Sequence, residues 1–157
     1  MMNQDVTPHL QKCANCRERA VSVEILRSYQ TALEHDGKKY EVALSNLPVL
    51  RCAHCGEIVF DDEAEVRLSA ALRSAVGLLS PEEIRRHRDA LGLTQKQLAN
   101  FLKIADSTLS RWETGAQIQQ RCMDTFLRSF FQVPELRTYL GWAAWNAIAL
   151  DRVHFSS

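Results

Sequence analysis

LTQKQLANFLKIADSTLSRWETG, residues 93–115, decides the fold, because it predicts two short helices joined by a tight turn. Thr94 is followed three residues later by a glutamine, which is the spacing of a capping box, so the first helix is expected to begin near Gln95. A second helix is expected from about Ala105 to Glu113, with Gly115 as its terminator because glycine tolerates a positive φ. Two helices this short bury too little surface to fold alone, so other helices must pack against them.

Such a pair predicts a helix-turn-helix, whose protruding second helix enters the major groove of B-DNA. Arg111 on the outer face of that helix can fork onto a guanine edge or clamp a phosphate, and Ser107 lies one turn earlier. The alternative is a solvated surface on which Arg111 pairs with Glu113 or Asp106. The further candidate DNA contacts lie near the starts of the two helices: Thr94, Gln95, Lys96, Asp106 and Thr108.

The same stretch resembles the DNA-binding core of the Cro/Xre-type repressors, over roughly residues 81–131. Lys103 stands where the turn of those proteins usually has a glycine, so a positive φ is expected there at a cost of about 1 kcal/mol. Ala105 replaces their usual serine cap, which leaves Asp106 as a shifted cap or as a first-turn acid favoured by the helix dipole.

Helices are also predicted on both sides of this motif. Ser80 and Pro81, with the glutamates that follow, combine an N-cap, a first-turn proline and a capping acid, and Gly92 closes this helix. Its basic stretch, residues 85–88, can touch phosphates or form a solvated face. After Gly115, apolar side chains at helical spacing are expected in the core: Met123, Phe126, Leu127, Phe130 and Phe131.

Three further expectations concern the C-terminal third of the chain. Cys122 is expected to be a small buried hydrophobic residue, and residues 119–121 can donate to a phosphate. A last helix from Leu136 to about Leu150 is apolar over more than half of its circumference, so a second subunit is the natural cover. This helix predicts a homodimer, and the alternative is a helix that is buried within its own chain.

Two CxxC pairs, Cys13 with Cys16 and Cys52 with Cys55, are separated by 35 residues. Four thiolates satisfy the tetrahedral preference of Zn²⁺ and leave no position open for catalytic water, so one structural zinc ion per chain is predicted. The alternatives are a redox dithiol, which needs only one pair, and a site in which His54 replaces one cysteine.

The segment between the pairs predicts a β-hairpin that the zinc ion fastens at its open end. One strand is expected from Ala20 to Leu33 and a second from Tyr40 to Leu47, with Asp36-Gly37 as the turn and residues 46–48 as a break. A helix capped by Asp61 or Asp62 then runs to about Val76 and ends at Gly77.

These patterns predict an α+β protein, with a zinc-binding domain in residues 1–76 and an all-α helix-turn-helix domain in residues 81–157. The first part carries nine basic against eleven acidic residues, and residues 81–137 carry nine against seven, so the positive excess follows the motif that is expected to bind DNA. No apolar run reaches the roughly 18 residues that span a bilayer, and no signal peptide is evident, so a cytoplasmic protein is expected.

The order of these parts is similar to that of the MqsA antitoxins, which have a YgiT-type zinc finger followed by a Cro/Xre-type domain. The resemblance rests on LRCAHCGE (residues 50–57), LTQKQLANFL (residues 93–102) and LSRWETG (residues 109–115). It implies zinc ligands at the four paired cysteines, a base-reading Arg111, a dimer that represses its own operon at a palindrome, and a toxin that binds the zinc domain. Ser107 stands where the family has a base-reading asparagine, so a different operator sequence is expected.

Two other functions remain open for this sequence. The first is a free-standing zinc-containing regulator without a toxin partner. The second is an enzyme that uses its cysteines for redox chemistry, but no histidine, serine or carboxylate constellation accompanies them, so no enzymatic activity is expected.

Overall fold

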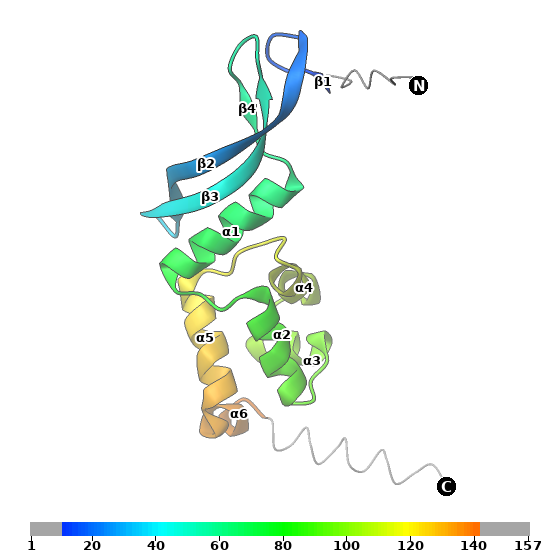
Figure 1. Ribbon diagram of the computed structural model, residues 1–157. Coiled ribbons are helices and arrows are strands. Elements are labelled where there is room, and N and C mark those ends of the chain that lie inside the picture. The colour runs from blue at the N-terminus through cyan, green and yellow to red at the C-terminus, as the bar shows by residue number, and fades with distance from the viewer. Residues whose placement is uncertain (1–10, 142–157) are drawn as a thin grey trace, which may run out of the picture. The chain divides into compact units, whose positions relative to one another are not determined.

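The structure, a computed structural model, describes residues 11–141 of the chain and has an α+β fold. The chain divides into two compact units. The first unit contains residues up to Leu33 together with Lys39–Leu72, and the second contains Glu34–Lys38 and the chain from Arg73 onward. The strands belong mainly to the first unit, and all helices after α1 belong to the second (Figure 1).

The sheet of the first unit has four strands in the order β1-β2-β3-β4, where β1 is Gln11–Lys12, β2 is Arg19–His35, β3 is Lys38–Cys52 and β4 is Ile58–Val59. Asp36 and Gly37 connect β2 to β3 with φ angles of 48° and 70°. Positive φ at both central residues is the conformation that matches a two-residue turn to the twist of its strands. The predicted hairpin and its turn are therefore confirmed.

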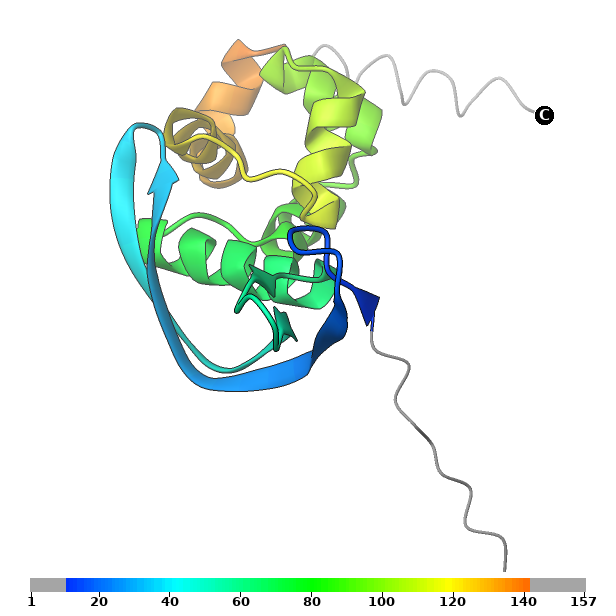
Figure 2. The same ribbon diagram turned by 90° about the horizontal axis from the view of Figure 1, so that it is seen from above.

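The expected break at residues 46–48 is wrong, because β3 continues through it to the second cysteine pair. Asn46 has a φ of 50°, and the guanidinium of Arg67 donates to the carbonyl oxygens of Asn46 and of the residue before it, at 2.7 and 2.6 Å. Leu44 and Leu47 lie in the same apolar cluster although three positions separate them. Asn46 thus acts as an inserted residue of the bulge type, which bends the strand instead of ending it, and Figure 2 shows the hairpin as a strongly curved ribbon.

Helix α1 (Asp62–Val76) follows the sheet and begins as the sequence predicts. The Oδ1 atom of Asp61 accepts the backbone N–H of Ala64 at 2.9 Å, which makes Asp61 the cap. Ala64 is fully buried against Leu47 and Val49 of β3. A small side chain at this position lets the helix approach the sheet closely. The helix ends at Gly77, which has a φ of 80°.

The second unit contains five helices among the described residues: α2 (Pro81–Ala90), α3 (Gln95–Leu102), α4 (Asp106–Thr114), α5 (Arg121–Gln132) and α6 (Pro134–Tyr139). Capping boxes begin both α2 and α3, with Ser80 and Thr94 as the caps, as predicted. The core joins α2, α3, α4 and α5 around Ile84, Leu98, Leu109, Leu127 and Phe130, which are fully buried. Phe126, Met123 and Phe131 pack against this core, as expected.

The turn between α3 and α4 has the backbone that the sequence predicts. Lys103 adopts a φ of 57°, and Ala105 stands at the N-cap of α4 without a side-chain cap. Asp106 is the first residue of α4 and lies at the positive end of the helix dipole. Gly115 ends α4 with a φ of 83°.

Three expectations for the C-terminal third need correction. Cys122 is exposed, because α5 turns Asp124 and Leu127 inward and Cys122 lies on the opposite side. Gln119 is fully buried and donates to the carbonyl of Leu79 at 2.7 Å, so its side chain is not available to a phosphate. The predicted helix from 136 to 150 ends at Tyr139 within α6, and its remainder from residue 142 lies outside the described residues.

No helix in the described part of the chain combines the length and the apolar character that a bilayer crossing requires.

Candidate metal centre and nucleic-acid interface

The four paired cysteines converge at one end of the sheet. The Sγ atoms of Cys13 and Cys55 lie 3.7 Å apart, those of Cys16 and Cys52 lie 3.6 Å apart, and all four sulfurs lie within 4.8 Å of one another. A tetrahedral ion with metal–sulfur bonds of about 2.3 Å requires sulfurs about 3.8 Å apart. The donor set and its spacing therefore fit one tetrahedral metal ion.

Each cysteine pair forms a knuckle, and the two knuckles share one hydrogen-bond pattern. The N–H of Cys13 donates to the carbonyl of Glu18 at 2.8 Å, and the N–H of Cys52 donates to that of Glu57 at 2.9 Å. The residue after each pair has a positive φ, 77° at Gly56 and 66° at Arg17. Glycine adopts this conformation readily, whereas at Arg17 an ordinary side chain is held in it.

The electrostatics of the cluster favour a bound cation. Backbone N–H groups of Cys55 and His54 donate to the sulfur of Cys52 and, with smaller contributions from neighbouring sulfurs, lower its pKa to about 7. The backbone N–H of Glu18 acts in the same direction on Cys16, but desolvation and the other three sulfurs outweigh it and raise the pKa of Cys16 to about 12. Four sulfurs this close cannot all ionise unless a positive charge lies between them.

The side chain of His54 is exposed and is not part of this cluster. Asn15, inside the first knuckle, donates its Nδ2 to the sulfur of Cys55 at 3.9 Å and to Glu57 at 3.4 Å. The amide therefore ties one knuckle to the other from outside the ligand set, as groups that orient metal ligands do. The spacing of the cysteines does not indicate this contact.

The second candidate site is the outer face of α4. Arg111, Ser107 and Asp106 are exposed on it, and Thr108 is half-buried. Within residues 11–141, the guanidinium of Arg111 makes no hydrogen bond or ion pair. The alternative in which Arg111 pairs with Glu113 does not occur, because the Glu113 carboxylate is buried and binds other groups.

The three predicted contacts from α3 differ in their surroundings. Lys96 is exposed, and Thr94 is exposed with its hydroxyl accepting the N–H of Gln97 at 3.2 Å. Gln95 is half-buried, and its Nε2 donates to the carboxylate of Glu113 at 2.8 Å.

Sequence reasoning missed the partner of Gln95, the buried Glu113. Its carboxylate also accepts the Nε of Arg88 at 2.6 Å, and the guanidinium of Arg85 donates to its backbone oxygen at 2.6 Å. These two arginines of α2, which were candidates for phosphate contacts, bind within the unit. The available signal was helical spacing, since Leu109, Trp112 and Glu113 occupy one inward face of α4 at positions i, i+3 and i+4.

The family model for MqsA, the antitoxin component of a bacterial toxin–antitoxin system, matches residues 11–140, which includes both candidate sites. No curated protein matches the chain.

Proposed function

Because the chain belongs to the MqsA antitoxin family, we propose that it is the antitoxin of a type II toxin–antitoxin pair and a DNA-binding repressor of its own operon. In this proposal a homodimer binds a palindromic operator through the second unit, and the zinc-bound first unit neutralises the toxin. The observation that carries the DNA-binding part is Arg111, whose exposed guanidinium has no polar partner among residues 11–141 and lies on a short helix whose opposite face is buried.

Helices α3 and α4 act in this proposal as the helix-turn-helix, with α4 in the major groove. Trp112 and Leu109 fix the inner face of α4 in the core, so Arg111 and Ser107 are directed outward together. A guanidinium that makes no internal contact loses none when it binds the edge of a guanine. Lys96 and Thr94, at the exposed start of α3, are suited to phosphate contacts that position the helix.

Arg111→Ala is expected to weaken operator binding by about 1–3 kcal/mol and to relax the preference for one base pair, because the two hydrogen bonds to a guanine are lost. Lys96→Ala is expected to weaken binding to all sequences alike. It should also reduce the slope of log affinity against log salt concentration by about one, because one fewer counterion is released. Titration of labelled operator and scrambled duplexes at several salt concentrations measures both effects. Arg27→Ala, which removes an exposed arginine of β2, is the control and should leave DNA binding unchanged. Unchanged operator affinity in Arg111→Ala would refute the placement of α4 in the groove.

The ion in the first unit is Zn²⁺ in this proposal, held by Cys13, Cys16, Cys52 and Cys55. The four-sulfur donor set and its tetrahedral spacing favour zinc over ions that prefer oxygen ligands. Four protein ligands leave no open position, so the ion stabilises the fold and takes part in no reaction. The same reasoning supports a binding protein over an enzyme.

The toxin-binding surface is proposed on β2. Val23 and Ile25 are 68% and 62% exposed, and they share one face of the strand because side chains two positions apart do. Val21, on the same face, lines a cavity of about 160 Å³ with Leu50 and Val59. We place the apolar contact to the toxin on these two side chains because they are neighbours on one strand face, and contiguous exposed apolar surface is typical of protein-binding sites.

Ile25→Lys is expected to abolish neutralisation of the toxin, because it places a charge in an apolar interface. The measurement is growth of cells that express the toxin-like reading frame adjacent to this gene together with each variant. Val66→Lys, which changes an equally exposed aliphatic residue of α1 (67%), is the matched control and should still protect the cells. Full protection by Ile25→Lys would exclude this surface. A neighbouring frame that is harmless, or no such frame, would favour the free-standing regulator.

A further inference from the structure

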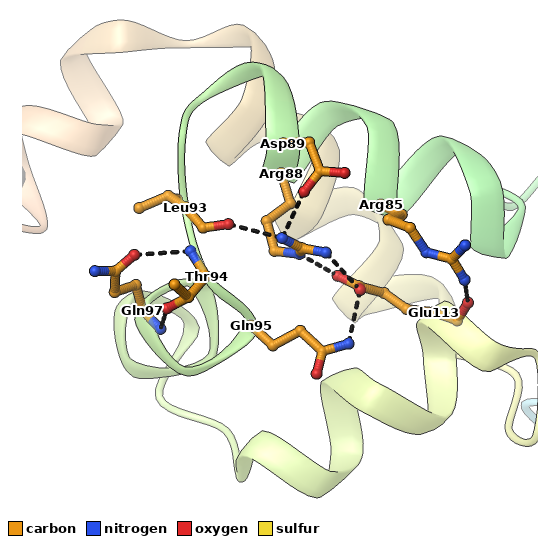
Figure 3. Close-up of polar contacts among 8 residues, drawn as sticks. All are labelled: Arg85, Arg88, Asp89, Leu93, Thr94, Gln95, Gln97 and Glu113. Atoms are coloured by element: carbon orange, nitrogen blue, oxygen red, sulfur yellow. Dashed lines mark hydrogen bonds and ion pairs between the residues drawn. The ribbon is translucent and has the colours of Figure 1, made fainter.

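Glu113 is the most deeply buried charged residue in the described part of the second unit and lies at the inner side of the last turn of α4. Its side chain is 1% exposed. One carboxylate oxygen accepts the Nε of Arg88 at 2.6 Å, and the other accepts the Nη2 of Arg88 at 3.0 Å and the Nε2 of Gln95 at 2.8 Å (Figure 3). The carboxylate is thus held by a two-pronged guanidinium from α2 and by the first residue of α3.

The neighbouring backbone is held from the same side. The guanidinium of Arg85 donates to the carbonyl of Glu113 at 2.6 Å, and Arg88 donates to the carbonyl of Leu93 at 2.7 Å and to Asp89 at 2.6 Å (Figure 3). The pKa of Arg88 is raised, first by its hydrogen bonds to Glu113. The polar contacts of Arg88 and Glu113 therefore join α2, the connection before α3, the start of α3 and the end of α4.

Directional contacts control orientation in a way that apolar packing does not. Apolar burial depends on area and tolerates small rotations of a helix about its axis, whereas a bidentate guanidinium–carboxylate pair fixes both distance and angle. Such buried pairs add little net stability compared with apolar residues of similar volume. The contribution specific to Glu113 is therefore the orientation of α4, and Arg111 stands only two residues away from it.

We infer that Glu113, held by Arg88 and Gln95, is a positioning residue that sets the rotation of α4 and hence the aim of Arg111. Gln95 then acts through Glu113 and not on DNA directly. The carboxylate also couples the start of α3, where Thr94 and Lys96 are proposed to meet phosphates, to the base-reading side chain of α4. This inference rests on the proposed DNA-binding function.

Glu113→Gln tests the inference, because it preserves the shape of the side chain and removes the charge that holds Arg88. Operator affinity is expected to fall by about tenfold or more, because a misdirected Arg111 loses its paired hydrogen bonds to a guanine edge. Affinity for a scrambled duplex and the slope against salt concentration should remain those of the wild type, because no phosphate contact is removed. All titrations are made below the melting temperature of each variant. A variant that melts earlier but binds its operator with wild-type affinity would show that Glu113 is only structural.

Gln95→Met provides a second test that does not depend on the folding of Glu113→Gln, since Arg88 still holds the carboxylate. Gln95→Met is expected to weaken binding to the operator and to leave binding to the scrambled duplex unchanged. When both changes are combined, the loss should be smaller than the product of the two single losses, because both variants break one chain of contacts. Losses that multiply would show that Gln95 acts on DNA independently of Glu113. A wild-type protein that binds no operator refutes the proposed function itself, whereas normal wild-type binding with unaffected variants refutes only the positioning role.

Discussion

Cys52→Ser is expected to abolish zinc binding and to unfold the sheet of the first unit, while the helices of the second unit stay folded. Cys52 is 1% exposed, and its sulfur belongs to the tetrahedral set with Cys16. Binding of a structural zinc ion contributes on the order of 10 kcal/mol to the folding of such modules, and a serine hydroxyl does not replace a thiolate as ligand. The buried cores of this unit are small, and Cys52 itself belongs to one of them, so little remains to compensate for the loss.

The measurements are zinc content per chain and the NMR amide spectrum, in which the resonances of the strands should collapse and those of α2–α5 should persist. Chelation of the wild-type protein should give the same spectrum. Cys122→Ser is the matched control, because Cys122 is exposed on α5 and lies outside the cysteine cluster. It should bind one zinc ion and melt like the wild type. A Cys52→Ser protein with an intact sheet would show that the fold of the first unit does not depend on metal.

Arg88→Met is expected to lower the free energy of unfolding of the second unit by about 3–5 kcal/mol, the cost of leaving a buried charge without its partner. The Glu113 side chain is 1% exposed, so it keeps only the Gln95 donor when the guanidinium is removed. Glu113→Gln should lower the free energy of unfolding by less, because Arg88 retains its contacts with Asp89 and with the carbonyl of Leu93. Urea unfolding followed by the fluorescence of the tryptophans, with Trp112 in the core, measures these differences.

The double variant Arg88→Met with Glu113→Gln separates the charge from the packing. Replacing a buried ion pair by neutral groups of similar volume is often close to neutral, so the double variant should recover most of the stability lost in Arg88→Met. Arg86→Met, on the exposed side of α2, controls for helix propensity and should change stability by less than about 0.5 kcal/mol. A double variant no more stable than Arg88→Met would mean that the arginine stabilises the unit through its packing and not through charge.

Local chemistry explains why much of the fold could be predicted. Ser80 and Thr94 indicate helix starts because a capping box satisfies backbone N–H groups within four residues. Both capping boxes are present in the structure. Lys103 could be assigned a positive φ because the position, not the residue, determines the backbone of this turn. The cysteine spacing alone was sufficient to predict that the four sulfurs lie together. Each of these inferences needs only neighbouring residues or one dominant interaction.

The wrong predictions have a common physical cause: residues far away in the sequence determine the local structure at these positions. Asn46 and Pro48 have the local character of a strand end, but Arg67, from a helix, satisfies the carbonyls at the bulge and β3 continues. Cys122 looked like a core residue by type, but the rotation of α5 places it in solvent. Helical spacing places Glu113 on the inward face of α4, but its partners Arg88 and Gln95 come from two other helices, so no window of sequence around Glu113 identifies them.

The strand order of the first unit has a consequence for the way in which the ion is captured. Every strand is hydrogen-bonded to its neighbour in the chain. Pairing of the long hairpin can therefore extend from the turn at Asp36 and Gly37 without contacts between residues far apart in the sequence. The two knuckles lie at the end of the hairpin away from this turn, and their thiols meet only when β2 and β3 are paired up to that end in the correct register. The ion therefore stabilises only a chain whose hairpin is paired in that register: pairing without metal stays transient, and a slip of one residue would leave the thiols unable to share an ion.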